Sequence, residues 1–237
     1  MSKGGEWQVT ESNELIFVHG VFQSEIKNRF LCTVKINDKD VTCYIPSSCR
    51  LSNFIDMNGR SVLLKPVTTA NARTPYAVYA VKYRRGYILL NLAESNRVIE
   101  SQIHRRLFHF LGKRKTISHE YNIGKYKADI FIHDSKTVIE IKSTLAFGDS
   151  ACFPTVYSER AVKQLKEISK LLDEGYLACY MLVSLNPQVK KVVINRQVDD
   201  FYQAFVECVN KGMLYSAFSI QIKNQKPEIR SKIEIAI

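Results

Sequence analysis

The chain has 237 residues, with 34 Lys and Arg against 23 Asp and Glu, which gives a formal net charge of +11 at neutral pH. Hydrophobic residues make up 46% and charged residues 24%, with only ten Gly and six Pro, so the composition excludes a disordered or fibrous chain. The basic excess favours a polyanion such as nucleic acid as partner, although net charge also serves solubility. Residues 1–110 carry 15 basic and 9 acidic residues and residues 111–237 carry 19 and 14, so both halves contribute to it.

The sequence lacks the patterns of secreted and membrane proteins. No stretch approaches the roughly 20 apolar residues of a membrane span, and no apolar run follows the polar first residues. We therefore expect a soluble, intracellular protein. The cysteines are scattered without a C-x-x-C pair, which indicates reduced, mostly structural thiols: Cys32, Cys43, Cys49, Cys152, Cys179 and Cys208.

The first part of the chain reads as short strands separated by turn residues. Asn37-Asp38 is typical of a hairpin turn, and Asn58-Gly59 and Arg85-Gly86 divide later strands. The spacing predicts a small antiparallel barrel or sandwich, and an OB-like barrel fits it. The expected strands cover residues 15–22, 30–36, 41–45, 61–64, 76–83 and 87–92.

After residue 92 the apolar spacing becomes helical, which places a domain boundary there, with domains 1–92 and 93–237. Ser95 or Asn96 is a plausible N-cap and Gly112 a stop for the first helix. Further helices are expected over 158–173 and 199–211. Strands are expected over 120–132, 137–143, 176–185, 192–195 and 213–222, while residues 223–237 have less pattern. This alternation predicts a mixed α/β domain.

Two carboxylates interrupt neighbouring strands of this second domain. If the connecting turn is centred on Asp134-Ser135, Asp129 faces Glu140 across the hairpin. Their Cβ atoms would then lie roughly 4.5–5.5 Å apart, and like charges at that distance destabilise a sheet unless a cation lies between them. Hard oxygen ligands suit Mg²⁺ or Mn²⁺.

Lys142 lies on the same strand face as Glu140, since side chains alternate with a period of two. Beside a metal it would orient an attacking water or stabilise negative charge, which is the logic of phosphodiester hydrolysis. The alternative is a solvated ion pair on a polar strand face. The apolar residues around both carboxylates favour a covered sheet, in which an unpaired carboxylate is costly.

These residues carry a family resemblance. Residues 129–132 (DIFI) and 138–145 (VIEIKSTL) resemble the PD-(D/E)xK nuclease core. Residues 153–154 (FP) and 158–167 (SERAVKQLKE) are similar to a signature of the sugar fermentation stimulation protein (SfsA) family, and residues 43–51 (CYIPSSCRL) resemble its first-domain segment. The similarity runs from about residue 15 to residue 222.

The resemblance implies a bacterial or archaeal cytoplasmic protein with an OB-like domain followed by a restriction-endonuclease-like domain. It further implies nucleic-acid binding, with nuclease activity proposed for the family. The family's PD-(D/E)xK residues fall on Asp129, Glu140 and Lys142, with the two carboxylates as metal ligands. This chain differs from the usual pattern at Thr155 and at Ser47-Ser48-Cys49.

Gln164 also differs, standing where the family usually has His. Many nucleases of the wider superfamily place a Gln on the helix after the ExK strand, so we include Gln164 among the catalytic candidates. Arg160 and Gln164 share a helix face with Lys163 close by, and we expect Arg160 and Lys163 to contact phosphate. The alternative is a surface helix on which both cations are only solvated.

Basic and aromatic residues interleave in the first domain, as suits a surface on which bases stack. Arg50, Arg84 and Arg85 are candidate nucleic-acid contacts there, although alternating aromatics are more often core. Glu120 is a further acidic candidate, which a salt bridge to Lys125 or Lys127 would explain equally well.

Two functions remain open at this point. The first is a Mg²⁺- or Mn²⁺-dependent nuclease acting on DNA, RNA or both. The second is a non-catalytic DNA-binding protein, for example a regulator of sugar metabolism, that keeps the nuclease fold. The sequence leaves the strandedness of the substrate, any sequence specificity and the oligomeric state undecided.

Overall fold

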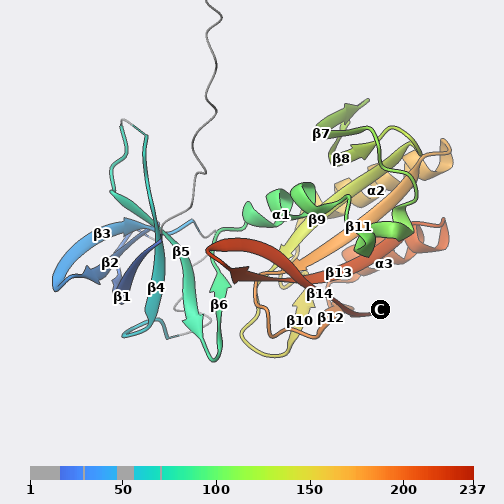
Figure 1. The fold of residues 1–237 in the computed structure, drawn as a ribbon. Coiled ribbons are helices and arrows are strands. Elements are labelled where there is room, and N and C mark those ends of the chain that lie inside the picture. Colours follow the sequence, from blue (N-terminus) through green and yellow to red (C-terminus); the bar gives the residue numbers. More distant parts are fainter. Residues whose placement is uncertain (1–16, 29, 47–55, 70) are drawn as a thin grey trace, which may run out of the picture.

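The structure, a computed structural model, describes residues 17–28, 30–46, 56–69 and 71–237. The first part of the chain forms a small barrel, and the second part forms a larger sheet covered by helices (Figure 1). In the described residues no helix is long and apolar enough to cross a membrane. The five cysteines within these ranges are free thiols.

The barrel consists of strands in the order β3-β2-β1-β4-β5-β6. A parallel pair between Tyr44 of β3 and Ala77 of β5 closes the first five strands into a barrel. Strand β6 pairs antiparallel with β5. The turn between β2 and β3 is formed by Asn37 and Asp38, both at positive φ (47° and 63°), as a tight hairpin requires. The strands are β1 (Val18–Glu25), β2 (Leu31–Ile36), β3 (Lys39–Tyr44), β4 (Ser61–Pro66), β5 (Tyr76–Tyr83) and β6 (Gly86–Leu89).

One glycine is required by close packing inside the barrel. A Cβ atom added to Gly20 of β1 would lie 2.5 Å from Val34 Cγ1 and 3.1 Å from the Lys35 carbonyl oxygen. Val34 is fully buried in the barrel core. The absence of a side chain at Gly20 therefore lets β2 lie tightly against β1.

The larger sheet has eight strands in the order β10-β12-β14-β13-β11-β9-β8-β7. Strands β9, β11 and β13 run parallel at its centre, whereas β7, β8 and β14 pair antiparallel with their sheet neighbours β8, β9 and β13. The elements are α1 (Glu94–Gln102), the 3₁₀ helix η2 (Arg106–Leu111), β7 (Ile117–Ile123), β8 (Tyr126–Ile132), β9 (Thr137–Thr144), β10 (Ser150–Phe153), α2 (Glu159–Asp173), β11 (Leu177–Ser184), β12 (Lys191–Ile194), α3 (Asp199–Asn210), β13 (Leu214–Lys223) and β14 (Lys226–Ala236).

The helices cover both faces of this sheet. Helices α2 and α3 pack on one face through an apolar cluster that includes Leu165 and Phe205. Helices α1 and η2 pack on the other face through a second apolar cluster, which also includes Tyr79 and Leu89 of the barrel. The expected OB-like barrel followed by a mixed α/β domain is confirmed. The boundary at residue 92 stays a prediction, since buried contacts continue across it.

Two expectations about elements were wrong, and the last strand of the chain was not predicted. The helix over 95–112 is interrupted after Gln102, and η2 follows, because the break lets both Ile103 and Phe108 reach one buried cluster. The single strand over 120–132 is the hairpin β7–β8, since Gly124 adopts a φ of 55° and reverses the chain. In the less patterned residues 223–237, the strand β14 begins at Lys226, after a turn at Asn224-Gln225, and pairs with β13.

Candidate functional site

The strand pair β8–β9 positions the two predicted carboxylates. Its register pairs Ile130 with Ile139 and Ile132 with Thr137, which is the predicted alignment. The ladder ends at Ile130. Beyond Ile130 a side chain bonds to β9, because the Oδ2 of Asp129 accepts a 2.7 Å hydrogen bond from the Ile141 backbone N–H. Asp129 is thereby fixed against the strand that carries Glu140.

Glu140 is almost completely buried and has a partner at each carboxylate oxygen. Lys142 Nζ lies 2.6 Å from Oε1, and the hydroxyl of Tyr126 donates a 2.5 Å hydrogen bond to Oε2. Lys142 Nζ also donates to Gln164 Oε1 at 2.8 Å. The structure therefore links three of the predicted side chains, Glu140, Lys142 and Gln164, in one chain of contacts.

The electrostatics around Asp129 favour added positive charge. Burial, followed by the charge of Glu140, raises the pKa of Asp129 from 3.8 to about 6. The Ile141 N–H, Lys142 and Asn96 act in the opposite direction. Because a proton or a cation would reduce the repulsion between Asp129 and Glu140, the arrangement suits a cation site.

Asn96 is a site residue that the sequence analysis missed, since it was considered only as a helix cap. Its Nδ2 donates a 3.1 Å hydrogen bond to Asp129 Oδ1. Ala93 is the N-cap of α1 and makes no side-chain cap bond. No local signal marks Asn96, because its partner lies 33 residues away in the sequence.

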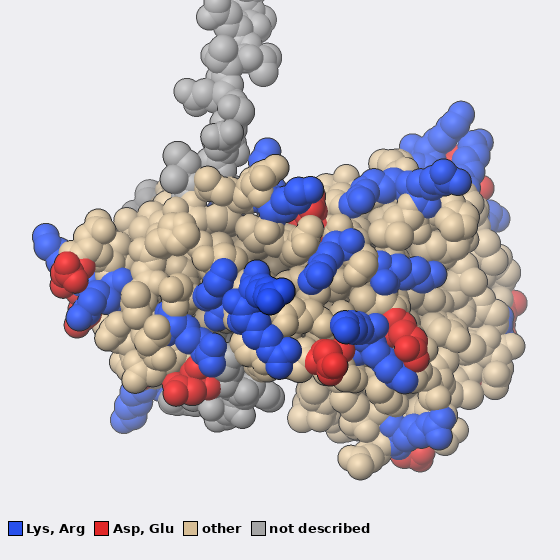
Figure 2. Space-filling view, turned by 60° about the horizontal axis from the view of Figure 1, so that its bottom comes forward, with Lys and Arg blue, Asp and Glu red and all other residues tan. Residues whose placement is uncertain are grey.

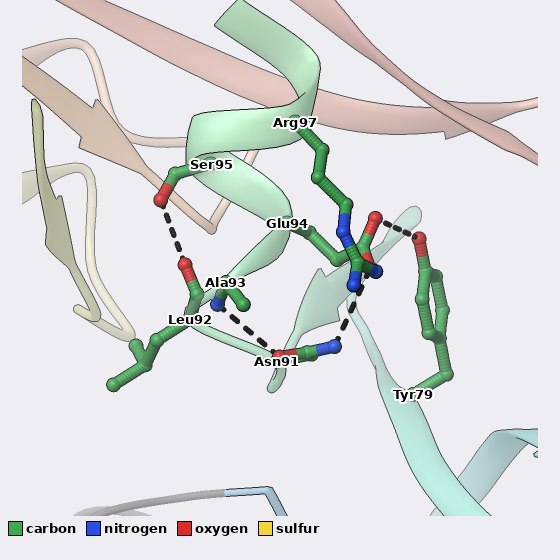
Figure 3. Close-up of polar contacts among 7 residues, drawn as sticks. All are labelled: Tyr79, Asn91, Leu92, Ala93, Glu94, Ser95 and Arg97. Atoms are coloured by element: carbon green, nitrogen blue, oxygen red, sulfur yellow. Dashed lines mark hydrogen bonds and ion pairs between the residues drawn. The ribbon is translucent and has the colours of Figure 1, made fainter. Parts of the chain in front are cut away.

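Contacts to the barrel fix the start of the helix that carries Asn96 (Figure 3). The hydroxyl of Tyr79 donates to Glu94 Oε2 at 3.2 Å, and Arg97 pairs with Oε1 of the same carboxylate at 2.8 Å. Asn91 Nδ2 also donates to this carboxylate, at 3.3 Å. The barrel thus supports the position from which α1 reaches Asp129.

Two tyrosines that the sequence analysis did not single out surround Glu140. Tyr126 donates to Glu140, and burial together with this carboxylate raises the pKa of its phenol well above the usual value. Tyr180 lies opposite Glu140 in the β9–β11 register, and its fully buried hydroxyl has no hydrogen-bond partner within the described residues. Both are buried aromatics, a pattern that a sequence does not separate from ordinary core.

A cleft of about 470 Å³ opens beside the carboxylates, between strands β7 to β9 and helix α2. Ser158 caps helix α2 by accepting a hydrogen bond from the Ala161 N–H. The helix buries Val162 and Leu165, while Arg160 and Gln164 line the cleft. The cleft is lined by Glu120, Lys125, Tyr126, Lys127, Ala128, Asp129, Glu140, Lys142, Glu159, Arg160, Lys163, Gln164 and Glu167.

The remaining candidates differ in their surroundings. Lys163 forms an exposed ion pair with Glu159 at 2.7 Å, whereas Arg160 has no ion-pair partner among the described residues. Glu120 is exposed and pairs with Lys127 at 2.8 Å, which is the salt bridge considered as its alternative role.

The barrel candidates lie elsewhere. Arg84 and Arg85 form the turn between β5 and β6 and line a different groove, which shares no lining residue with the cleft. Arg50 lies outside the described residues. The structure therefore brings together the carboxylates, Lys142, Gln164, Arg160 and Lys163, and it leaves the barrel arginines apart.

Family models match both parts of the chain. Residues 93–226 match the model described as "Sugar fermentation stimulation protein RE domain", and residues 26–90 match "SfsA N-terminal OB domain". The chain belongs to the sugar fermentation stimulation protein family. The resemblance stated from the sequence motifs is thereby confirmed.

Individual relatives agree with the family models. Proteins named "Sugar fermentation stimulation protein homolog" from Clostridium perfringens strain 13 and Thermoanaerobacter sp. strain X514 are 25% and 26% identical. The first match covers 89% of this chain and 93% of the relative, and the second 93% and 97%. A homolog from Methanococcoides burtonii is 26% identical over 78% of this chain and 79% of its own length.

A solved structure shares the fold. It is described as "The structure of Pyrococcus Furiosus SfsA in complex with Ca2+" and superposes with a TM-score of 0.77 at 21% sequence identity. The match covers 95% of this chain and all of that chain. This agreement extends over both the barrel and the α/β domain of the SfsA family fold.

The donor set at Asp129 and Glu140 fits a small divalent cation. Mg²⁺ is commonly held by one or two carboxylates, with water and substrate phosphate as its other ligands. Among the described residues, no group of three or more His, Cys, Asp and Glu side chains could hold a metal ion.

Proposed function

We propose that this SfsA-family protein is a divalent-metal-dependent nuclease that hydrolyses phosphodiester bonds in DNA or RNA. The observation that carries the proposal is that Asp129, Glu140, Lys142 and Gln164 line one open cleft, in which Lys142 contacts both Glu140 and Gln164. The relatives come from bacteria and an archaeon, and a cytoplasmic location is part of the proposal.

In this proposal Asp129 and Glu140 would hold Mg²⁺ or Mn²⁺. The Pyrococcus furiosus SfsA structure is a complex with Ca²⁺, which supports a divalent cation in this family. A bound ion would polarise the scissile phosphate and lower the pKa of a coordinated water. The raised pKa of Asp129 supports this assignment, because burial and the charge of Glu140 disfavour its ionised form, which a bound cation would stabilise.

Lys142 would stabilise the negative charge that develops on the phosphate, and Gln164 would hold the Lys142 ammonium group in place. Their 2.8 Å contact supports these roles. Arg160, which has no ion pair in the described part of the chain, would contact the substrate phosphate, with Lys163 beside it. Arginine suits this role because its planar guanidinium binds phosphate with two hydrogen bonds.

One observation favours the alternative of a non-catalytic DNA-binding or regulatory protein. Both oxygens of Glu140 already have partners, Lys142 and Tyr126, so the buried carboxylate is satisfied without a metal. A protein of this kind would bind nucleic acid with a strong salt dependence and no requirement for a cation.

The deciding experiment compares the native protein with Glu140→Gln and Lys142→Met on labelled single- and double-stranded DNA and RNA. Each substrate is incubated with Mg²⁺, Mn²⁺, Ca²⁺ or EDTA. The proposal expects cleavage by the native protein with Mg²⁺ or Mn²⁺, none in EDTA, and a loss of at least about 100-fold in both variants. Thermal unfolding verifies that the variants are folded.

Glu174→Gln serves as the matched control, because Glu174 follows the end of α2 and does not line the cleft. It should cleave at the native rate. Equal cleavage by the native protein and both site variants would contradict the assignment of these residues. Binding without any cleavage, under every metal condition, would favour the non-catalytic alternative.

A further inference from the structure

A second hollow, of about 900 Å³, lies where the barrel meets the larger sheet. The turn between β5 and β6, the loop 187–190 and strands β13 and β14 form its walls. We call it the junction groove. Its lining consists of Lys82, Arg84, Arg85, Gly86, Tyr87, Asp149, Pro187, Gln188, Val189, Lys190, Gln221, Ile222, Arg230, Ser231, Lys232 and Ile233.

Direct contacts join the two sides of the junction groove. The Leu89 N–H donates to the Leu185 carbonyl at 3.1 Å, and Gln188 Nε2 donates to the Tyr83 carbonyl at 3.2 Å. A Cβ atom on Gly86 would lie 3.3 Å from Pro187 Cγ, so the β5–β6 turn packs closely on the loop. A ligand would therefore meet a surface that is already formed.

The charge of the junction groove is strongly one-sided. Its described lining holds six basic residues and one acidic residue, Asp149. The cleft beside Asp129 and Glu140, by contrast, is lined by five basic and five acidic residues. All six basic residues are exposed, and in the described part of the chain none of them forms an ion pair. Figure 2 shows Lys and Arg gathered in the middle of one face, over the junction between barrel and sheet.

Aromatic rings and backbone groups hold several of these cations without neutralising them. Lys82 Nζ lies 4.8 Å from the ring centre of Tyr87, and Lys232 Nζ lies 5.1 Å from that of Phe110. Arg230 donates a 2.5 Å hydrogen bond to the carbonyl of Pro187. The positive charge is thus positioned by groups that leave it available to an anion.

We propose that the junction groove binds the phosphodiester backbone of a nucleic acid, as a contact separate from the catalytic cleft. The inference rests on the proposed function only in taking nucleic acid as the substrate. Six uncompensated cations, contributed by the β5–β6 region, the loop 187–190 and β14, fit an extended polyanion better than a single phosphate. Release of counterions from the nucleic acid would drive this binding.

Binding is measured separately from cleavage, by anisotropy of labelled 20-nucleotide single strands and duplexes in EDTA over a salt series. Arg85→Glu with Lys190→Glu is the test variant, since neither side chain forms an ion pair with another described residue. We expect the affinity at about 0.1 M salt to fall at least about tenfold. The slope of log K against log salt should decrease by about 0.7–0.9 for each phosphate that the variant no longer neutralises.

The control is Lys35→Glu with Lys39→Glu, which changes the net charge equally. Both lysines are exposed in the β2–β3 hairpin, at the end of the barrel that points away from the larger sheet (Figure 1). The control should bind within about twofold of the native protein. An equal loss in both double variants, or none in the test variant, would overturn the proposal.

Anionic phosphatidylserine vesicles form a further arm of the experiment. Binding of the native protein to vesicles but to none of the oligonucleotides would also overturn the proposal. The binding measurement is separate from the nuclease assignment, because it is made in EDTA and follows residues that do not line the cleft beside Asp129 and Glu140. If nothing is cleaved while the test variant still loses affinity, the nuclease assignment fails and the junction groove stands.

Discussion

Asn96 of α1 donates a hydrogen bond of 3.1 Å to Asp129 of β8, and this contact joins the barrel-supported helix to the candidate metal site. Residues that orient a metal ligand in this way affect metal affinity although they do not touch the metal.

The first prediction concerns this contact. Asn96→Ala should weaken Mg²⁺ or Mn²⁺ binding by about tenfold, because Asp129 loses a hydrogen bond that orients its carboxylate. Isothermal titration with the metal measures the affinity. Ser101→Ala on the same helix should leave it unchanged, since the Ser101 hydroxyl donates to the Val98 carbonyl within the helix. An unchanged affinity in Asn96→Ala would show that Asp129 is oriented without it.

The second prediction concerns pH. The pKa of Asp129 is raised in the folded protein from 3.8 to about 6, so the folded state favours the protonated carboxyl. The contribution of Asp129 to the free energy of unfolding is therefore fully present below about pH 4 and is lost as the pH rises through 6. This difference in pKa between the folded and unfolded states changes the free energy of unfolding by at most about 3 kcal/mol.

Asp129→Asn removes this titration. In EDTA, its free energy of unfolding relative to the native protein should rise by about 2–3 kcal/mol between pH 4 and pH 7. Urea unfolding at several pH values measures the difference. A difference that is constant across this range would mean that Asp129 titrates normally. Mg²⁺ should stabilise the native protein at pH 7 and have little effect on the variant.

The third prediction concerns the buried partner of Glu140. Tyr126→Phe should lower the free energy of unfolding by about 1.5–3 kcal/mol, since it removes a hydrogen bond to a buried charged group. Tyr121→Phe is the control, because Tyr121 lies on the neighbouring strand β7 and is partly exposed. Equal stabilities of the two variants in urea unfolding would argue against a role for the Tyr126 hydroxyl.

The fourth prediction concerns the barrel. Gly20→Ala should destabilise the protein by about 1–3 kcal/mol, because the added methyl group would meet Val34 and the Lys35 carbonyl. Gly148→Ala should change the stability much less, since its nearest neighbours would lie 3.8 Å or more away. The test is a comparison of unfolding midpoints, and a milder effect at Gly20 than at Gly148 would contradict the packing described for β1 and β2.

Much of the local structure follows from the sequence because it depends on neighbouring residues. The Asp134-Ser135 turn predicts the β8–β9 register, and the apolar spacing after Ser158 predicts helix α2 with Gln164 on its cleft side. The family motifs then place Asp129, Glu140 and Lys142 in one site. In each case a turn residue, a cap or a period of two or four residues carries the information.

Other features depend on interactions between distant segments, which local patterns do not encode. The Asn96–Asp129 and Tyr126–Glu140 hydrogen bonds form only when α1, β8 and β9 pack together. The final strand β14 acquires its structure by pairing with β13. The sequence by itself determined the strands of the barrel, the carboxylate hairpin and the basic excess. Only the tertiary structure decided which side chains support Asp129 and Glu140 and where the uncompensated cations converge, because burial and charge pairing depend on chain segments that meet only on folding.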